Sequence, residues 1–179
     1  MKKLIDSFKK YENPAGGSGD KGNFHSYIES YQEILDKTSN VKLLEIGCAR
    51  GDSAMMWADY LDDSEIICAD IHNNQIYPQT GWRLIHANAC TQEFADLFTD
   101  DYFDYIIDDG SHLLGDQLKS FELLFKKLKN KGKYIIEDIQ DIDSEKDYFL
   151  NLYKDVKIID LRNERPLKDN VLVLINKNE

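Results

Sequence analysis

The sequence contains little that would cross-link the chain or anchor it in a membrane. It has only three cysteines, Cys48, Cys68 and Cys90, and they show no C-x-x-C spacing. We therefore expect reduced, buried thiols rather than a disulfide framework or a zinc site. No apolar run approaches the ~20 residues of a membrane helix. Residues 1–10 carry lysines but no apolar segment of a secretory signal, so we expect a cytoplasmic protein without a membrane partner.

The sequence also lacks the basic excess of most proteins that bind nucleic acids. Asp and Glu number 33 against 22 Lys and Arg, for a net charge of −11. Lysines gather only over residues 126–133, where a solvated helix end explains them, because cations suit the negative end of a helix dipole. A nucleic-acid partner is therefore not expected.

The length of 179 residues predicts a single domain spanning 1–179, with an N-terminal lid or helical cap over 1–40 and a core over 41–179. The Gly-rich stretch Asn13–Asn23 is either a flexible connection or a mobile lid that closes over a cofactor. Helical periodicity follows over Phe24–Asp36.

From Val41 onward, short apolar runs alternate with helical patterns. Such alternation predicts an α/β fold with a doubly wound, Rossmann-like, mostly parallel sheet and helices on both faces. The last two apolar runs are joined without a helix, which predicts an antiparallel pair at one side of the sheet. The expected strands are Val41–Ile46, Ile66–Ala69, Arg83–His86, Tyr105–Ile107, Tyr134–Ile136, Val156–Leu161 and Val171–Asn176. The expected helices are Asp52–Leu61, Thr91–Phe98, Leu114–Lys129 and Glu145–Tyr153.

The first strand ends in LLEIGCARGDS, a turn that opens into a helix and is suited to binding a nucleotide-like ligand. Gly47 and Gly51 allow a sharp turn and a close approach of the backbone. Asp70 ends the second strand about twenty residues beyond Gly51, a spacing at which an acid can accept hydrogen bonds from ribose hydroxyls. The alternative for Asp70 is an acid that caps a helix or a turn.

Four carboxylates follow the fourth and fifth strands, in the segments YIIDDGSH and YIIED. Because neighbouring parallel strands end at one edge of a sheet, Asp108, Asp109, Glu137 and Asp138 are expected to lie close together, and a hard cation such as Mg²⁺ would relieve their repulsion. His112 is a candidate general base. A helix N-terminus would favour its neutral form, whereas the nearby carboxylates would favour the charged form.

The E-x-G-x-x-x-G turn, with Ala49 where a dinucleotide fingerprint has glycine, resembles that of the class I methyltransferases. That resemblance implies the strand order 3-2-1-4-5-7-6 and S-adenosylmethionine as cofactor. It places Gly47 and Gly51 at the methionine end of the cofactor, Asp70 at the ribose and Asn88 near the adenine, although a plain turn residue is the alternative for Asn88. The expected cofactor-binding residues are Glu45, Gly47, Gly51, Ser53, Asp70 and Asn88.

A closer resemblance rests on DDGSH followed by IED and preceded by DKGNFHSY, together spanning about Asp20 to Ile139. These motifs are similar to those of the metal-dependent sugar O-methyltransferases of macrolide and other glycoside pathways, a group that includes cephalosporin hydroxylase-like proteins. The resemblance implies Mg²⁺ or another divalent cation held by Asp109, Glu137 and Asp138, with His112 as the base. It also implies a glycoside hydroxyl as acceptor and leaves a homo-oligomer open.

Two other functions stay open at this point. One is a Rossmann-type, nucleotide-dependent oxidoreductase. The other is a non-catalytic partner subunit that keeps only the fold. The sequence does not identify the methyl acceptor.

Overall fold

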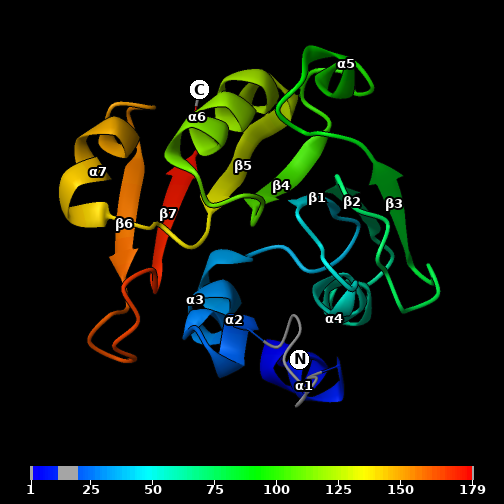
Figure 1. The fold of residues 1–179 in the computed structure, drawn as a ribbon. Coiled ribbons are helices and arrows are strands. Elements are labelled where there is room, and N and C mark those ends of the chain that lie inside the picture. Colours follow the sequence, from blue (N-terminus) through cyan, green and yellow to red (C-terminus); the bar gives the residue numbers. More distant parts are fainter. Residues whose placement is uncertain (1, 12–19, 179) are drawn as a thin grey trace.

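The computed structural model describes residues 2–11 and 20–178 (Figure 1). Most of the Gly-rich stretch Asn13–Asn23 lies outside the described residues, and so does the lid expected there. Its end, Asp20–Asn23, forms the short helix α2. Every helix in the described part of the chain is too short or too polar to cross a bilayer.

Seven strands form one sheet in the order β3-β2-β1-β4-β5-β7-β6, which confirms the expected fold class. β1 to β5 are parallel, and β7 is antiparallel to both β5 and β6. In the register, Ile46 pairs with Asp108 and Asp108 pairs with Ile136, so three central strands end at the same level. The strands are β1 (Lys42–Ile46), β2 (Glu65–Asp70), β3 (Trp82–His86), β4 (Phe103–Asp108), β5 (Leu128–Ile136), β6 (Val156–Asp160) and β7 (Val171–Asn176).

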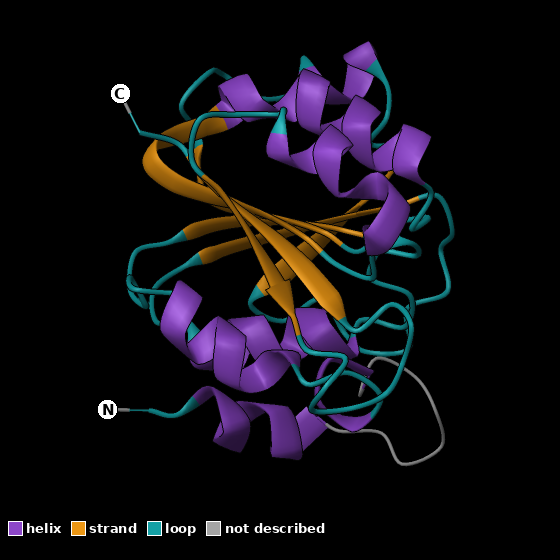
Figure 2. Cartoon of the chain, turned by 90° about the vertical axis from the view of Figure 1, so that its left-hand side faces the viewer, coloured by secondary structure: helices purple, strands orange, loops and turns teal. Residues whose placement is uncertain are grey.

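Helices cover both faces of this sheet and give the molecule three layers (Figure 2). One face carries α1 (Leu4–Tyr11), α3 (Tyr27–Ile34) and α4 (Asp52–Tyr60), and the other carries α5 (Gln92–Ala95), α6 (Leu114–Leu124) and α7 (Ile142–Leu150) (Figure 1).

Each face of the sheet has its own apolar cluster. Alternate strand residues point to opposite faces. Accordingly, Leu43 and Ile107 pack in the cluster under α3 and α4, whereas Leu44 and Ile106 pack under α5 and α6. Burial on both faces explains why the strands read as continuous apolar runs.

The helix expected over Leu114–Lys129 ends earlier than its sequence suggested. α6 stops at Leu124, a 3₁₀ turn spans Phe125–Lys127, and β5 begins at Leu128. Leu128 is fully buried and pairs with Phe103 of β4, so sheet pairing determines its conformation. α5 is also shorter than the range expected for it, and α7 keeps the expected length but begins and ends three residues earlier than expected.

Candidate functional site

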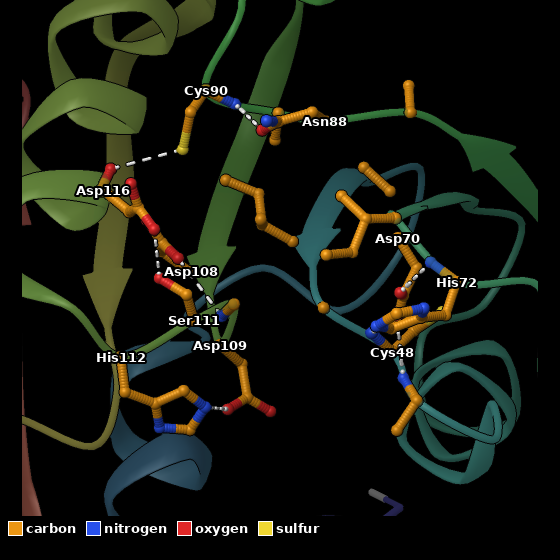
Figure 3. Close-up of a pocket in the computed structure, with 18 of the residues that line it drawn as sticks. Cys48, Asp70, His72, Asn88, Cys90, Asp108, Asp109, Ser111, His112 and Asp116 are labelled. Atoms are coloured by element: carbon orange, nitrogen blue, oxygen red, sulfur yellow. Dashed lines mark hydrogen bonds and ion pairs between the residues drawn. The ribbon is translucent and has the colours of Figure 1, made fainter.

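A cavity of about 550 Å³ lies at the edge of the sheet where the parallel strands end (Figure 3). Open α/β sheets bind ligands at this edge, and the volume is that of a small-molecule site. Asp70 and His72 lie on one side of the cavity and Asp109 and His112 on the other. Six of the expected site residues line it: Gly47, Ser53, Asp70, Asn88, Asp109 and His112.

The turn after β1 requires glycine at Gly47. This residue has φ +77°, and a Cβ atom there would lie 2.0 Å from the carbonyl oxygen of Asp109. β1 can therefore turn against the end of β4 only without a side chain at this position. Gly51, with φ +92°, occupies the N-cap of α4 and contacts Trp82 rather than the cavity.

Glu45 lies beneath the turn and is fully buried. Its carboxylate accepts hydrogen bonds from Ser53 Oγ at 2.8 Å and Trp57 Nε1 at 3.1 Å. Glu45 thereby links β1 to α4 and supports the turn from below, whereas Ser53 also faces the cavity.

Asp70 orders the same turn from the end of β2. One carboxylate oxygen accepts the N–H groups of Cys48 and Ala49, and the other accepts the N–H of His72 at 2.7 Å. Asp70 is thus a turn-capping acid, the alternative considered from the sequence, and it also lines the cavity.

Asn88 and Cys90 line the far end of the cavity. Asn88 Oδ1 accepts the N–H of Cys90 at 2.8 Å and closes a tight turn. Cys90 is only partly buried, contrary to the expectation of three buried thiols. All three cysteines are free, as expected.

Asp109, His112 and Asp138 form a group that could hold a metal ion. One ligand atom from each lies within 4.8 Å of the others. His112 Nδ1 is 3.1 Å from Asp138 Oδ2, and His112 Nε2 is 3.7 Å from Asp109 Oδ1. His112 and Asp138 both have positive φ, at 60° and 54°. Left-handed non-glycine residues are strained and cluster at functional sites.

The ionisation of His112 is governed by carboxylates. The hydrogen bond to Asp138 raises the pKa of His112 above its usual value, against the effect of burial. Burial raises the pKa of Asp138, but the hydrogen bond from His112 and the other polar contacts outweigh it and leave that pKa lowered. The carboxylates of Asp109 and Asp138 therefore outweigh burial and Lys21 and set the direction of this shift in the pKa of His112.

Glu137 is not part of this group, but it shares Lys21 with Asp109. Its Oε1 accepts hydrogen bonds from Lys21 Nζ at 2.7 Å and Tyr31 Oη at 2.5 Å. The sequence predicted no role for Lys21 or Tyr31. The motif DKGNFHSY, which contains Lys21, was the feature of the sequence that could have indicated one.

Asp108 takes no part in the metal-capable group. It is buried, accepts a hydrogen bond from Ser120 and one from the N–H of Gly110, and burial raises its pKa to about 6. These contacts fix the end of β4 against α6.

The segment after α2 packs on the loop between β6 and β7. His25 Nε2 lies 3.3 Å from Asp169 Oδ1, and Asn170 Oδ1 accepts the N–H of Ser26 at 3.0 Å. Tyr27 donates to Asp138 Oδ1 at 2.8 Å. This segment therefore borders the site on the side of Asp138.

Comparison with known proteins gives a consistent result. The family described as "Methyltransferase domain" matches residues 44–139. L-olivosyl-oleandolide 3-O-methyltransferase of Streptomyces antibioticus is 30% identical over 65% of this chain and 33% of its own length. Mycinamicin VI 2''-O-methyltransferase of Micromonospora griseorubida is 31% identical over 58% of this chain and 28% of its own length. The chain thus spans about a third of the length of these relatives.

Solved structures resemble the chain as well. The MycE methyltransferase of the mycinamycin pathway, in complex with Mg, SAH and mycinamycin VI, superposes with a TM-score of 0.65 at 27% identity. The match covers 77% of this chain and 37% of MycE. A SAM-dependent methyltransferase from Archaeoglobus fulgidus has a TM-score of 0.57 at 15% identity, covering 84% of this chain and 92% of that one, and shows the shared fold alone.

Proposed function

The chain belongs to the family of methyltransferase domains, and from that premise we propose that it transfers a methyl group from S-adenosylmethionine to a sugar hydroxyl of a glycosylated small molecule. The observation that carries the proposal is the cavity that extends from Asp70 past Gly47 to His112. Support for the acceptor comes from the names of the relatives. Support for the cofactor and for Mg²⁺ comes from the contents of the MycE complex.

The cofactor lies, in this proposal, along the turn after β1. Gly47 and Gly51 give the turn its shape, and Glu45 and Ser53 support it. The Asp70 carboxylate already accepts three backbone N–H groups. A carboxylate has about four acceptor sites, so roughly one is left for a ribose hydroxyl. Asn88, at the other end of the cavity, is assigned to the adenine.

Asp109, Glu137 and Asp138 are the proposed ligands of a divalent cation. The residues present fit such an ion, because oxygen atoms of Asp109 and Asp138 converge beside His112, and carboxylates are the ligands that Mg²⁺ prefers. Glu137 is the adjacent third carboxylate, shared with Lys21. When bound, the cation would supply Lewis acidity at the acceptor hydroxyl and a template for its orientation.

His112 is the proposed general base. Asp138 orients the ring through Nδ1 and leaves Nε2 on the side of Asp109. In the transfer, the carbon–sulfur bond of the sulfonium breaks as the carbon–oxygen bond forms. The hydroxyl proton passes to His112, and the cofactor leaves as a neutral thioether. Such proton transfer typically contributes 10²–10⁴-fold to the rate.

A direct test is methyl transfer from labelled S-adenosylmethionine to a panel of macrolide and aromatic polyketide glycosides, followed by mass spectrometry. We expect one methyl group on the sugar and none on the matching aglycone. Calorimetry with S-adenosylhomocysteine and with NAD in parallel separates cofactor binding from acceptor choice. Absence of S-adenosylhomocysteine binding would refute the function, and binding of NAD would favour the oxidoreductase. Binding without transfer to any glycoside would refute the acceptor class.

A further inference from the structure

Lys21 is a buried lysine at the centre of the site. Only 1% of its side chain is exposed, and Nζ lies 2.7 Å from Asp109 Oδ2, 2.7 Å from Glu137 Oε1 and 3.5 Å from Glu45 Oε1. Lysine is almost never fully buried unless it is paired. These three acids come from or directly follow the neighbouring strands β1, β4 and β5. One ammonium group therefore joins the ends of three strands.

Packing fixes the position of this ammonium group. At Gly22, the next residue, a Cβ atom would lie 2.6 Å from the ring of Phe8 and 2.9 Å from Ile28 Cγ1, so α2 fits tightly against α1 and α3. Three carboxylates within 3.5 Å of Nζ surround the ammonium group and compensate its buried charge.

Lys21 shares Asp109 with the group that could hold a metal. Asp109 Oδ2 contacts the ammonium group, while Oδ1 lies toward His112 Nε2. Glu137, another proposed ligand, gives Oε1 to the same ammonium group. A divalent cation at this place would thus draw on carboxylates that Lys21 already holds. The two positive charges would also repel each other strongly in a partly buried environment.

We propose that Lys21 is a positioning residue that acts as a built-in counter-ion, holding Asp109 and Glu137 in place and competing with the divalent cation for them. This inference rests on the proposed cation site. The ammonium group of Lys21 would keep the carboxylates paired when no metal is bound. It would also weaken the binding of the cation. Removing the charge should leave buried carboxylates uncompensated, which is costly. The folded state should then depend on the metal.

The test compares wild type with Lys21→Met in thermal melting, in excess chelator and across a Mg²⁺ titration. Methionine keeps the length of the side chain and removes its charge. In chelator, we expect the Tm of the variant to be lower than that of wild type, and Mg²⁺ should restore it. Half of this Mg²⁺-induced rise in Tm should occur at a Mg²⁺ concentration at least about tenfold lower than in wild type. Lys133→Met is the matched control, because Lys133 is a partly buried lysine paired with Asp36. It should melt lower by the same amount with and without Mg²⁺.

The outcomes separate this inference from the metal site itself. If Mg²⁺ shifts the Tm of wild type and of Lys21→Met at the same concentrations, Lys21 does not compete with the cation. That result would overturn this inference but would still support the metal site. No Mg²⁺ response in either protein would reject both. If Lys21→Met does not fold in either buffer, Lys21→Gln, which keeps a hydrogen-bond donor, replaces it. Failure of both variants to fold with Mg²⁺ would also overturn the proposal, since the cation would not replace the ammonium charge.

Discussion

Asp70 Oδ2 accepts the backbone N–H of Ala49 at 2.9 Å, across the turn that follows β1. The same oxygen accepts the N–H of Cys48 at 3.0 Å. Ala49 has φ +41°, a left-handed conformation that costs an L-residue about 1–2 kcal/mol. The two hydrogen bonds offset that cost. The shape of the turn after β1 therefore depends on an acid from the neighbouring strand.

Replacing Asp70 by Asn should weaken S-adenosylhomocysteine binding by about 10- to 100-fold, measured by calorimetry, because the amide keeps one acceptor oxygen and its NH₂ group cannot accept the hydrogen bonds made by the other. Tm should fall as well. Ala49→Gly is the control, since it keeps both bonds and suits the positive φ. That variant should bind with nearly unchanged affinity. Equal affinity of Asp70→Asn and wild type would remove Asp70 from the cofactor site.

Gly47→Ala should destabilise the domain by about 3 kcal/mol, or roughly 6–12 °C in Tm, because the new Cβ atom would collide with the Asp109 carbonyl. Gly115→Ala makes the same change in α6, where a Cβ atom would meet nothing within 4 Å. It should raise stability by up to about 1 kcal/mol. Similar Tm values for the two variants would contradict the close approach of β1 and β4.

The mostly parallel α/β sheet could be anticipated from the sequence, because continuous apolar runs alternate with helical patterns, and the strand order was implied by the resemblance to the class I methyltransferases. The start of β5 at Leu128 could not be anticipated in this way. Leu124 and Leu128 are four residues apart, a spacing that suits a helix, yet Leu128 pairs with Phe103 of β4. Local periodicity does not reveal a partner so far away in the chain, and tertiary pairing overrides it here.

His112→Ala should lower turnover by ~10²-fold or more while the affinity for S-adenosylhomocysteine stays nearly constant, because the base acts only in the chemical step. Steady-state kinetics and calorimetry on the same preparation test this. His86→Ala is the control: His86 lies in β3 and hydrogen-bonds to the Ile71 carbonyl. A loss of Tm in His112→Ala with turnover nearly intact would show that His112 only packs against its carboxylate neighbours.

Excess chelator should abolish methyl transfer and Mg²⁺ should restore it, whereas S-adenosylhomocysteine binding should persist. Asp138→Asn should raise the Mg²⁺ concentration needed for half-maximal turnover by about tenfold or more, because it removes a charged ligand. Asp143→Asn, which alters an exposed pair with Arg162, should leave that concentration unchanged. Full turnover in chelator would reject the metal requirement.

The convergence of Gly47, Asp70 and Asp109 also followed from the sequence, since each comes at or just after the end of a strand. The contacts of Lys21 did not. It lies 88 residues from Asp109 and 116 from Glu137 along the chain. A lysine that will be buried has no local pattern that distinguishes it from an exposed one. The motif DKGNFHSY around Lys21 indicated that this part of the chain matters, but not which residues Lys21 contacts.

The contacts between the segment after α2 and the β6–β7 loop have a consequence for biosynthesis. Ser26 binds Asn170, His25 lies beside Asp169, and Arg165 donates to the carbonyl of Gly22. A ribosome releases residues 20–27 long before residues 165–170. These early residues cannot complete their docking until the β6–β7 loop has emerged. The side of the site next to Asp138 is therefore completed only after the central strands β1, β4 and β5 have been synthesised.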